Sequence, residues 1–187
     1  MRKISVEAEL VAKAKAGEVA AFERIVMEFE PKLSRFIYGL VNERELSEDL
    51  VQETFVSAYR ALPSMPADLK LSAWLYKIAL NKVRSEKRKK RPVPWLPLPF
   101  FGQNNDEEAP ALELPDPSAD TAESIAKRDA IIGVLKKLPS DQSAALLMDA
   151  QGFDDDEIAE ALDCSTGAVR QKLFRARKAF KALYEDN

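Results

Sequence analysis

The feature that most constrains this chain is a basic stretch near its C-terminus, residues 165–181, which has the pattern of a helix with two unlike faces. At ~100° per residue, Val169 and Leu173 fall on one side of this helix, while Gln171 and Arg175 fall on the other. The stretch contains six Lys or Arg and no acidic residue, so its outer face carries an uncompensated positive field. One face is therefore expected to pack against protein, and the other to attract an anion.

A second short amphipathic helix is predicted just upstream, at residues 154–162, with acids in its first turn, where the helix dipole favours them. Ser165 is a suitable N-cap for the basic helix, and Asp163 stands where such a turn usually has Gly; Asp tolerates a left-handed backbone. This layout is that of a helix-turn-helix. The alternative is a helical hairpin with a solvated basic face. The small Ala159, the apolar Val169 and the charge bias together favour the DNA-reading interpretation.

Composition excludes several classes of function. The apolar content of 46% is typical of a globular protein, and no apolar run approaches the ~18 residues of a membrane span. The N-terminus lacks the apolar core of a signal peptide, so a soluble, cytoplasmic protein is expected. Because the chain has one cysteine, Cys164, and no histidine, a structural disulfide, a zinc site and nucleophile–imidazole catalysis are all excluded. We expect no catalytic residue, no metal and no cofactor.

Charge and proline are distributed unevenly along the chain. Residues 1–91 carry 18 basic and 13 acidic groups, residues 92–124 carry seven acidic groups and no basic one, and residues 125–187 carry 10 basic and 11 acidic groups. The middle segment also holds seven of the eleven prolines. We therefore predict an all-α fold with two small helical domains, 1–91 and 125–187, joined by a flexible, acidic, Pro-rich linker. The apolar cluster 95–101 in this linker either folds against a domain or binds a partner, and the choice stays open.

Apolar residues at helical spacing predict further helices at 7–15, 20–29, 33–41, 125–138 and 144–150. Pro31 is expected to end one helix or open the next. The segment 140–143 is expected to cap the helix that follows it.

An acidic stripe is predicted on the helix at residues 45–62. Glu45, Glu48, Asp49 and Gln52 follow the spacing i, i+3, i+4, i+7, and the stripe has no lysine four residues further on. Such a face is either a solvated surface or a docking patch for a basic partner, and the residues favour the two equally.

The helix predicted at residues 71–84 continues into a very basic segment, with seven Lys or Arg against one Glu between positions 82 and 91. Its apolar residues are assigned to the core. Aromatic, amide and cationic side chains alternate on the remaining surface, at Tyr76, Lys77, Asn81, Lys82 and Arg84. This mixture suits neutralisation of phosphates, stacking on an unpaired base and contact with a base edge, the last through the Asn81 amide.

Four blocks follow one another in an order typical of a known family. They are DLVQETF (49–55), WLYKIALN (74–81), LPSDQ (138–142) and GAVRQKLFRAR (167–177). Together they cover most of the chain outside the linker. With them the chain resembles bacterial sigma factors of the extracytoplasmic-function (ECF) type.

The resemblance implies a non-enzymatic subunit that docks on core RNA polymerase and recognises promoter DNA. The polymerase-binding residues would be Glu48, Asp49, Gln52 and Glu53, which would meet the coiled coil of the largest polymerase subunit. The loop around 64–71 and the helix after it would open and read the downstream (−10) element through Tyr76, Lys77, Asn81, Lys82 and Arg84. The upstream (−35) element would be read by Ser165, Thr166, Arg170, Gln171, Lys172, Phe174 and Arg175.

The linker would thread the nucleic-acid channels of the polymerase, and an anti-sigma factor, often membrane-tethered in this family, would be a further partner. A rival hypothesis is a duplex-binding regulator whose N-terminal half senses a ligand or dimerises. An enzyme is a third and weaker alternative, because the carboxylates lie on helix faces and do not converge.

Overall fold

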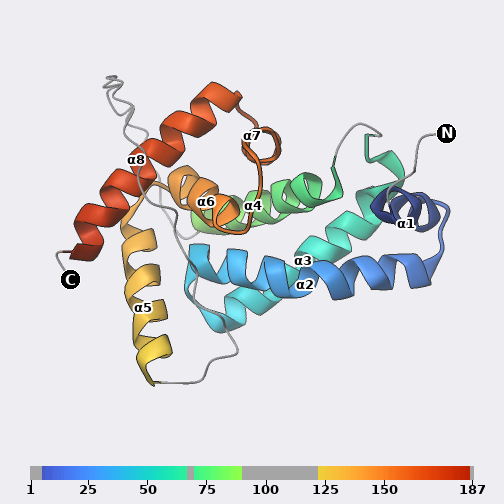
Figure 1. The fold of residues 1–187 in the computed structure, drawn as a ribbon. Coiled ribbons are helices and arrows are strands. Elements are labelled where there is room, and N and C mark those ends of the chain that lie inside the picture. The colour runs from blue at the N-terminus through green and yellow to red at the C-terminus, as the bar shows by residue number, and fades with distance from the viewer. Residues whose placement is uncertain (1–5, 67–69, 90–121, 186–187) are drawn as a thin grey trace.

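The computed structural model describes residues 6–66, 70–89 and 122–185, which form eight α-helices and one short 3-10 helix, with no β-strand among them (Figure 1). The helices are α1 (Val6–Lys15), α2 (Val19–Val41), α3 (Arg44–Ala61), η1 (Leu62–Ser64), α4 (Leu71–Lys89), α5 (Ala122–Lys137), α6 (Ser140–Asp149), α7 (Asp155–Leu162) and α8 (Thr166–Glu185). The predicted all-α fold is confirmed. Most of the predicted linker, including its apolar cluster 95–101, lies outside the described residues. Its last residues belong to α5, which begins at Ala122.

Helices α1 to α4 form the N-terminal half, with α2 as its centre. The inward stripe of α2 is fully buried, including Ile25, Leu33 and Phe36. The expectation that Pro31 ends or opens a helix is wrong, because α2 runs through it without a break. Pro31 and Met27, whose carbonyl loses its N–H donor, both lie on the exposed side of α2, where water can replace the missing hydrogen bond.

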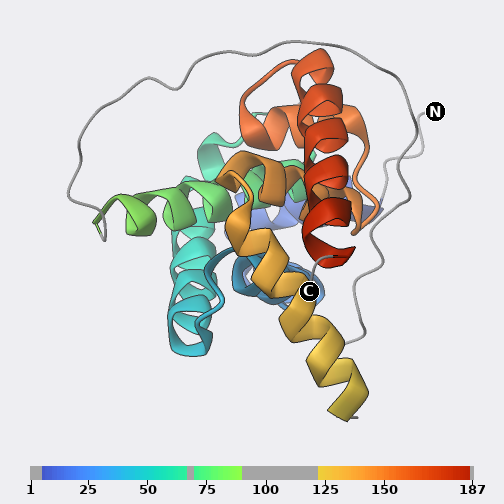
Figure 2. The same ribbon diagram turned by 90° about the vertical axis from the view of Figure 1, so that its left-hand side faces the viewer.

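Helices α5 to α8 form the C-terminal half, in which α8 packs on α5, α6 and α7 (Figure 2). Helix α6 begins at Ser140, so the prediction that residues 140–143 only cap it is wrong. Ser143 is buried inside the first turns of α6, and its hydroxyl donates to the carbonyl of Leu135 at 2.8 Å. This bond ties the end of α5 to α6.

The two halves pack directly on each other. Helix α4 lies against α7, and α2 lies against α5 and α6. Gly39 of α2 allows the closest approach, because a Cβ at this position would lie 2.9 Å from Cδ1 of Leu147 in α6. Buried side chains from both halves consequently form one continuous apolar cluster.

None of the described helices combines the length and the hydropathy that a membrane crossing needs.

Candidate nucleic-acid interface

The turn between α7 and α8 has the local chemistry that the sequence predicts. Asp154 and Glu157 form a capping box at the start of α7, with hydrogen bonds of 2.8 and 3.0 Å to each other's backbone N–H. Asp163 ends α7 with φ 58°, in the left-handed region. Ser165 then accepts a hydrogen bond of 3.2 Å from the backbone N–H of Ala168 and so caps α8. The predicted helix-turn-helix is confirmed in its geometry.

Helix α8 separates its two faces as predicted. Val169, Leu173 and Ala176 are buried against the rest of the C-terminal half. Of the residues predicted to read DNA, the exposed ones are Ser165, Arg170, Gln171 and Arg175, and the half-buried ones are Thr166, Lys172 and Phe174. The outer face therefore presents cations and an amide, the groups that contact phosphates and base edges.

Two basic residues of this face already have carboxylate partners. Nε of Arg170 lies 2.7 Å from Oδ2 of Asp155 in α7, and Nζ of Lys172 lies 3.5 Å from Oδ2 of Asp141 in α6. The hydrogen bond with Asp155 raises the pKa of Arg170. These contacts fix the direction of two side chains that the sequence assigns to DNA.

The five residues predicted on α4 do not share one face. Asn81 is exposed, and Lys82 is paired at 3.2 Å with Glu53 of α3. Lys77 and Arg84 point to the C-terminal half, where they pair with Asp163 at 3.3 Å and with Asp141 at 2.8 Å. Burial opposes the ionisation of Asp141, but Arg84 and Lys172 outweigh it and lower the pKa of Asp141.

Tyr76 is not on the surface, contrary to the sequence-based expectation. Its side chain is fully buried, and its ring lies between Phe36 of α2 and Phe153, which precedes α7, with ring centroids 4.7 and 4.5 Å away. The hydroxyl donates to Oε1 of Gln151. Burial raises the pKa of Tyr76, so this hydroxyl stays protonated. In this conformation Tyr76 cannot stack on a base.

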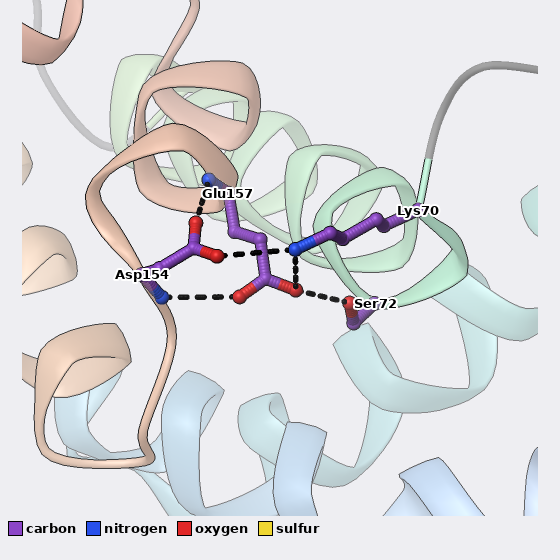
Figure 3. A network of polar contacts seen from close by, with 4 residues as sticks. All are labelled: Lys70, Ser72, Asp154 and Glu157. Carbon is purple, nitrogen blue, oxygen red and sulfur yellow. Dashed lines mark hydrogen bonds and ion pairs between the residues drawn. The ribbon is translucent and has the colours of Figure 1, made fainter.

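A polar network joins the start of α4 to the start of α7 (Figure 3). Nζ of Lys70, immediately before α4, lies 3.1 Å from Oδ2 of Asp154 and 3.4 Å from Oε1 of Glu157. The hydroxyl of Ser72 donates to Oε1 of Glu157 at 3.2 Å. The hydrogen bond from the backbone of Glu157, and then that from Lys70, lower the pKa of Asp154. The capping box of α7 thus also binds the other half of the molecule.

The acidic stripe of α3 is on the surface, and all four predicted polymerase-binding residues, Glu48, Asp49, Gln52 and Glu53, are exposed. The stripe is less isolated than its sequence suggests. Arg44, one helical turn before Glu48, forms an ion pair with it at 3.0 Å. Glu53 forms an ion pair with Lys82 of the neighbouring helix α4. This face of the N-terminal half remains open while one face of α4 is covered.

Sequence reasoning missed the residues that join the halves, above all Lys70, Gln151 and the acids of α6 and α7. From the sequence, the acids at 154–157 are explained by the dipole of their own helix alone. The one available signal was charge complementarity between a basic α4 and an acidic α7. Within the described residues no group of three or more His, Cys, Asp or Glu is arranged to hold a metal ion.

Comparison with known proteins places both halves in one family. Residues 25–93 match the model of sigma-70 region 2, and residues 128–180 match that of sigma-70 region 4. The first match contains α3 and α4, and the second contains the helix-turn-helix.

Curated relatives resemble the chain over nearly its whole length. RNA polymerase sigma-H factor of Pseudomonas aeruginosa is 31% identical over an alignment of 185 residues, and the match covers 94% of this chain and 92% of the relative. ECF RNA polymerase sigma-E factor of Escherichia coli K12 is 31% identical over 173 residues, and the match covers 91% of this chain and 90% of the relative.

Solved structures share the fold. CnrH, in complex with the cytosolic domain of CnrY, matches with a TM-score of 0.73 at 24% identity, over 97% of this chain and 98% of that one. The sigma factor RpoE of Bartonella quintana, in complex with the anti-sigma factor NepR, matches with a TM-score of 0.64 at 24% identity. This match covers 88% of this chain and 96% of that one. Given the two domain matches and the full-length relatives, the chain belongs to the ECF family of RNA polymerase sigma factors.

Proposed function

We propose that this sigma factor binds core RNA polymerase through the acidic face of α3 and reads promoter DNA with α4 and α8, contributing binding and no catalysis of its own. The observation that carries the proposal is the division of α8. Its apolar side is buried in the helix-turn-helix, whereas Arg170, Gln171 and Arg175 are exposed on the other side. An exposed basic and amide face on the second helix of this motif is what reading of the major groove requires.

The roles divide between the halves in the proposal. The α8 face would contact the upstream element in duplex DNA, and α4 would contact the downstream element where the strands separate. The domain bounds 1–91 and 125–187, joined by the acidic linker, are part of this proposal. We further propose that the protein acts in the cytoplasm and that an anti-sigma factor controls it, as NepR is bound to RpoE in the related complex.

The test is transcription by purified core polymerase on templates from the source genome, with and without the full-length chain. We expect specific initiation only in its presence, together with weak binding of the free chain to duplex DNA. Initiation no better than that of core polymerase alone would refute the proposal. Tight, sequence-specific duplex binding without polymerase would favour the rival regulator instead.

A further inference from the structure

One arginine on the outer face of α8 is held by a carboxylate of the neighbouring helix. Helix α7 packs beside α8 within the helix-turn-helix (Figure 1). Nε of Arg170 donates to Oδ2 of Asp155 at 2.7 Å, which is the length of a strong, charge-assisted hydrogen bond. The direction of the Arg170 side chain is therefore set by a residue of α7 as well as by α8 itself.

This hydrogen bond engages only the inner end of the guanidinium group. Arginine has five N–H donors, and four of them lie beyond Nε on the two Nη nitrogens. The side chain of Arg170 is 73% exposed although it is paired, whereas that of Asp155 is 35% exposed. The carboxylate is the better covered partner, so Arg170 keeps donors for a ligand while its Nε is engaged.

The backbone on both sides of the contact is well fixed. Asp155 is the first residue of α7 and directly follows Asp154, whose capping box with Glu157 sets the start of that helix. Arg170 directly follows Val169, which is fully buried. An arginine supported in this way loses less conformational freedom when it binds a ligand, and it presents its donors in one direction.

A carboxylate beside a DNA-binding surface carries an electrostatic cost, because it repels phosphates. The exposed Asp156, in the same turn of α7, adds further negative charge near Arg170. Contact with a phosphate does not require one fixed orientation of the guanidinium plane, whereas bidentate contact with a base edge does. A carboxylate that orients an arginine therefore favours reading of a base over neutralisation of the backbone.

We propose that Asp155 is a positioning residue for base recognition, and that it holds Arg170 so that its Nη groups meet a base edge in the major groove. The base that this geometry selects is guanine, whose O6 and N7 are paired acceptors for one arginine. The inference rests on the proposed function, in which α8 reads the upstream element. It adds that discrimination at one base pair depends on a residue of α7 that acts through Arg170.

The test uses holoenzyme reconstituted from core polymerase and the full-length chain. Its templates are a promoter library with a randomised upstream element, each linked to a barcode in the transcript, so that sequencing the RNA gives the base preference at every position. Arg170→Ala identifies the base pair that Arg170 reads, and Asp155→Ala is the test variant. Asp156→Ala is the matched control, because it removes the same charge from the next residue of the same turn. Asp155→Asn keeps an oxygen that can accept from Nε.

The expected result is a loss of preference at a single position. We expect Asp155→Ala to lose at least about fivefold of the preference for guanine at the base pair that Arg170→Ala identifies, and to keep the other preferences. Asp155→Asn should retain part of this preference, and Asp156→Ala all of it. In the Arg170→Ala background, Asp155→Ala should cause no further loss there, because a residue that acts through Arg170 then has nothing to position.

Three results with Asp155→Ala would overturn the proposal. They are wild-type preferences at every position, a uniform rise in transcription with unchanged preferences, and a loss spread evenly over all positions. The second would mean that the carboxylate only withholds Arg170 from phosphates, and the third that Asp155 only supports the fold of the helix-turn-helix.

The arginine and glutamine variants distinguish this inference from the proposed function. If Arg170→Ala changes no preference but Gln171→Ala or Arg175→Ala does, the role of Asp155 is overturned and α8 still reads the upstream element. If none of the three changes a preference, the assignment of α8 to this element is wrong as well.

Discussion

At the scale of single residues, Tyr76 decides how the two halves meet. It is a fully buried tyrosine whose ring contacts Phe36 in its own half and Phe153 in the other. A buried hydroxyl needs a partner, and Gln151 provides it. The side chain that the sequence assigns to base stacking is therefore part of the core that joins the two halves.

Tyr76→Phe separates these two roles, because it keeps the ring and removes the hydroxyl. We expect the free energy of unfolding to fall by about 1 kcal/mol, since Oε1 of Gln151 loses its hydrogen bond in a buried setting. Transcription with core polymerase should persist, because stacking needs only the ring. Denaturant unfolding of the full chain measures the first effect.

Tyr59→Phe is the matched control for that change. Tyr59 has a side chain about half exposed, and its ring contacts Phe22 at 5.0 Å between centroids. Its hydroxyl is not part of the interface between the halves, so its loss should leave stability within about 0.5 kcal/mol. Equal effects of the two substitutions on the free energy of unfolding would show that the hydrogen bond from Tyr76 to Gln151 does not stabilise the contact between the halves.

At the scale of helices, the features that depend on neighbouring residues could be predicted from the sequence. The left-handed Asp163, the Ser165 cap and the buried Val169 all follow from local turn and helix chemistry, and the structure confirms them. Contacts between residues far apart in the chain could not be predicted. Tyr76 fits an exposed position as well as a buried one until the helix that covers it is known, and the capping box gave no sign of Lys70.

Gly39 shows the same limit, because a glycine within an apolar helix has no pattern that reveals a close helix contact. Gly39→Leu should force α6 away from α2, since even a Cβ there meets Leu147 at 2.9 Å. We expect a loss of about 1–3 kcal/mol in the free energy of unfolding, measured by denaturant unfolding of the full chain.

Gly133→Leu in α5 is the control for this helix contact. A Cβ at position 133 meets no atom within 4 Å, so the substitution should only improve helix propensity, by up to about 1 kcal/mol. Similar stabilisation by both substitutions would mean that α2 and α6 do not pack closely in solution.

At the scale of the whole molecule, the closed form leaves one predicted interface open and covers another. The acidic face of α3 is exposed, whereas the cations of α4 that face the C-terminal half are paired with it. If polymerase docks on α3 as proposed, it can bind without any change in how the two halves pack.

Docking on the α3 face is tested by a charge change at an exposed position that takes no part in the contact between the halves. Asp49 is the residue to test, because Glu48 and Glu53 are already paired with Arg44 and Lys82. Asp49→Lys should weaken association with core polymerase by at least about tenfold, since a like charge facing a basic partner costs several kcal/mol. Glu23→Lys, at an exposed site of α2, makes the same charge change and should leave association intact. Unchanged association of Asp49→Lys at moderate salt would mean that the stripe is only a solvated surface and that the first contact with polymerase lies elsewhere.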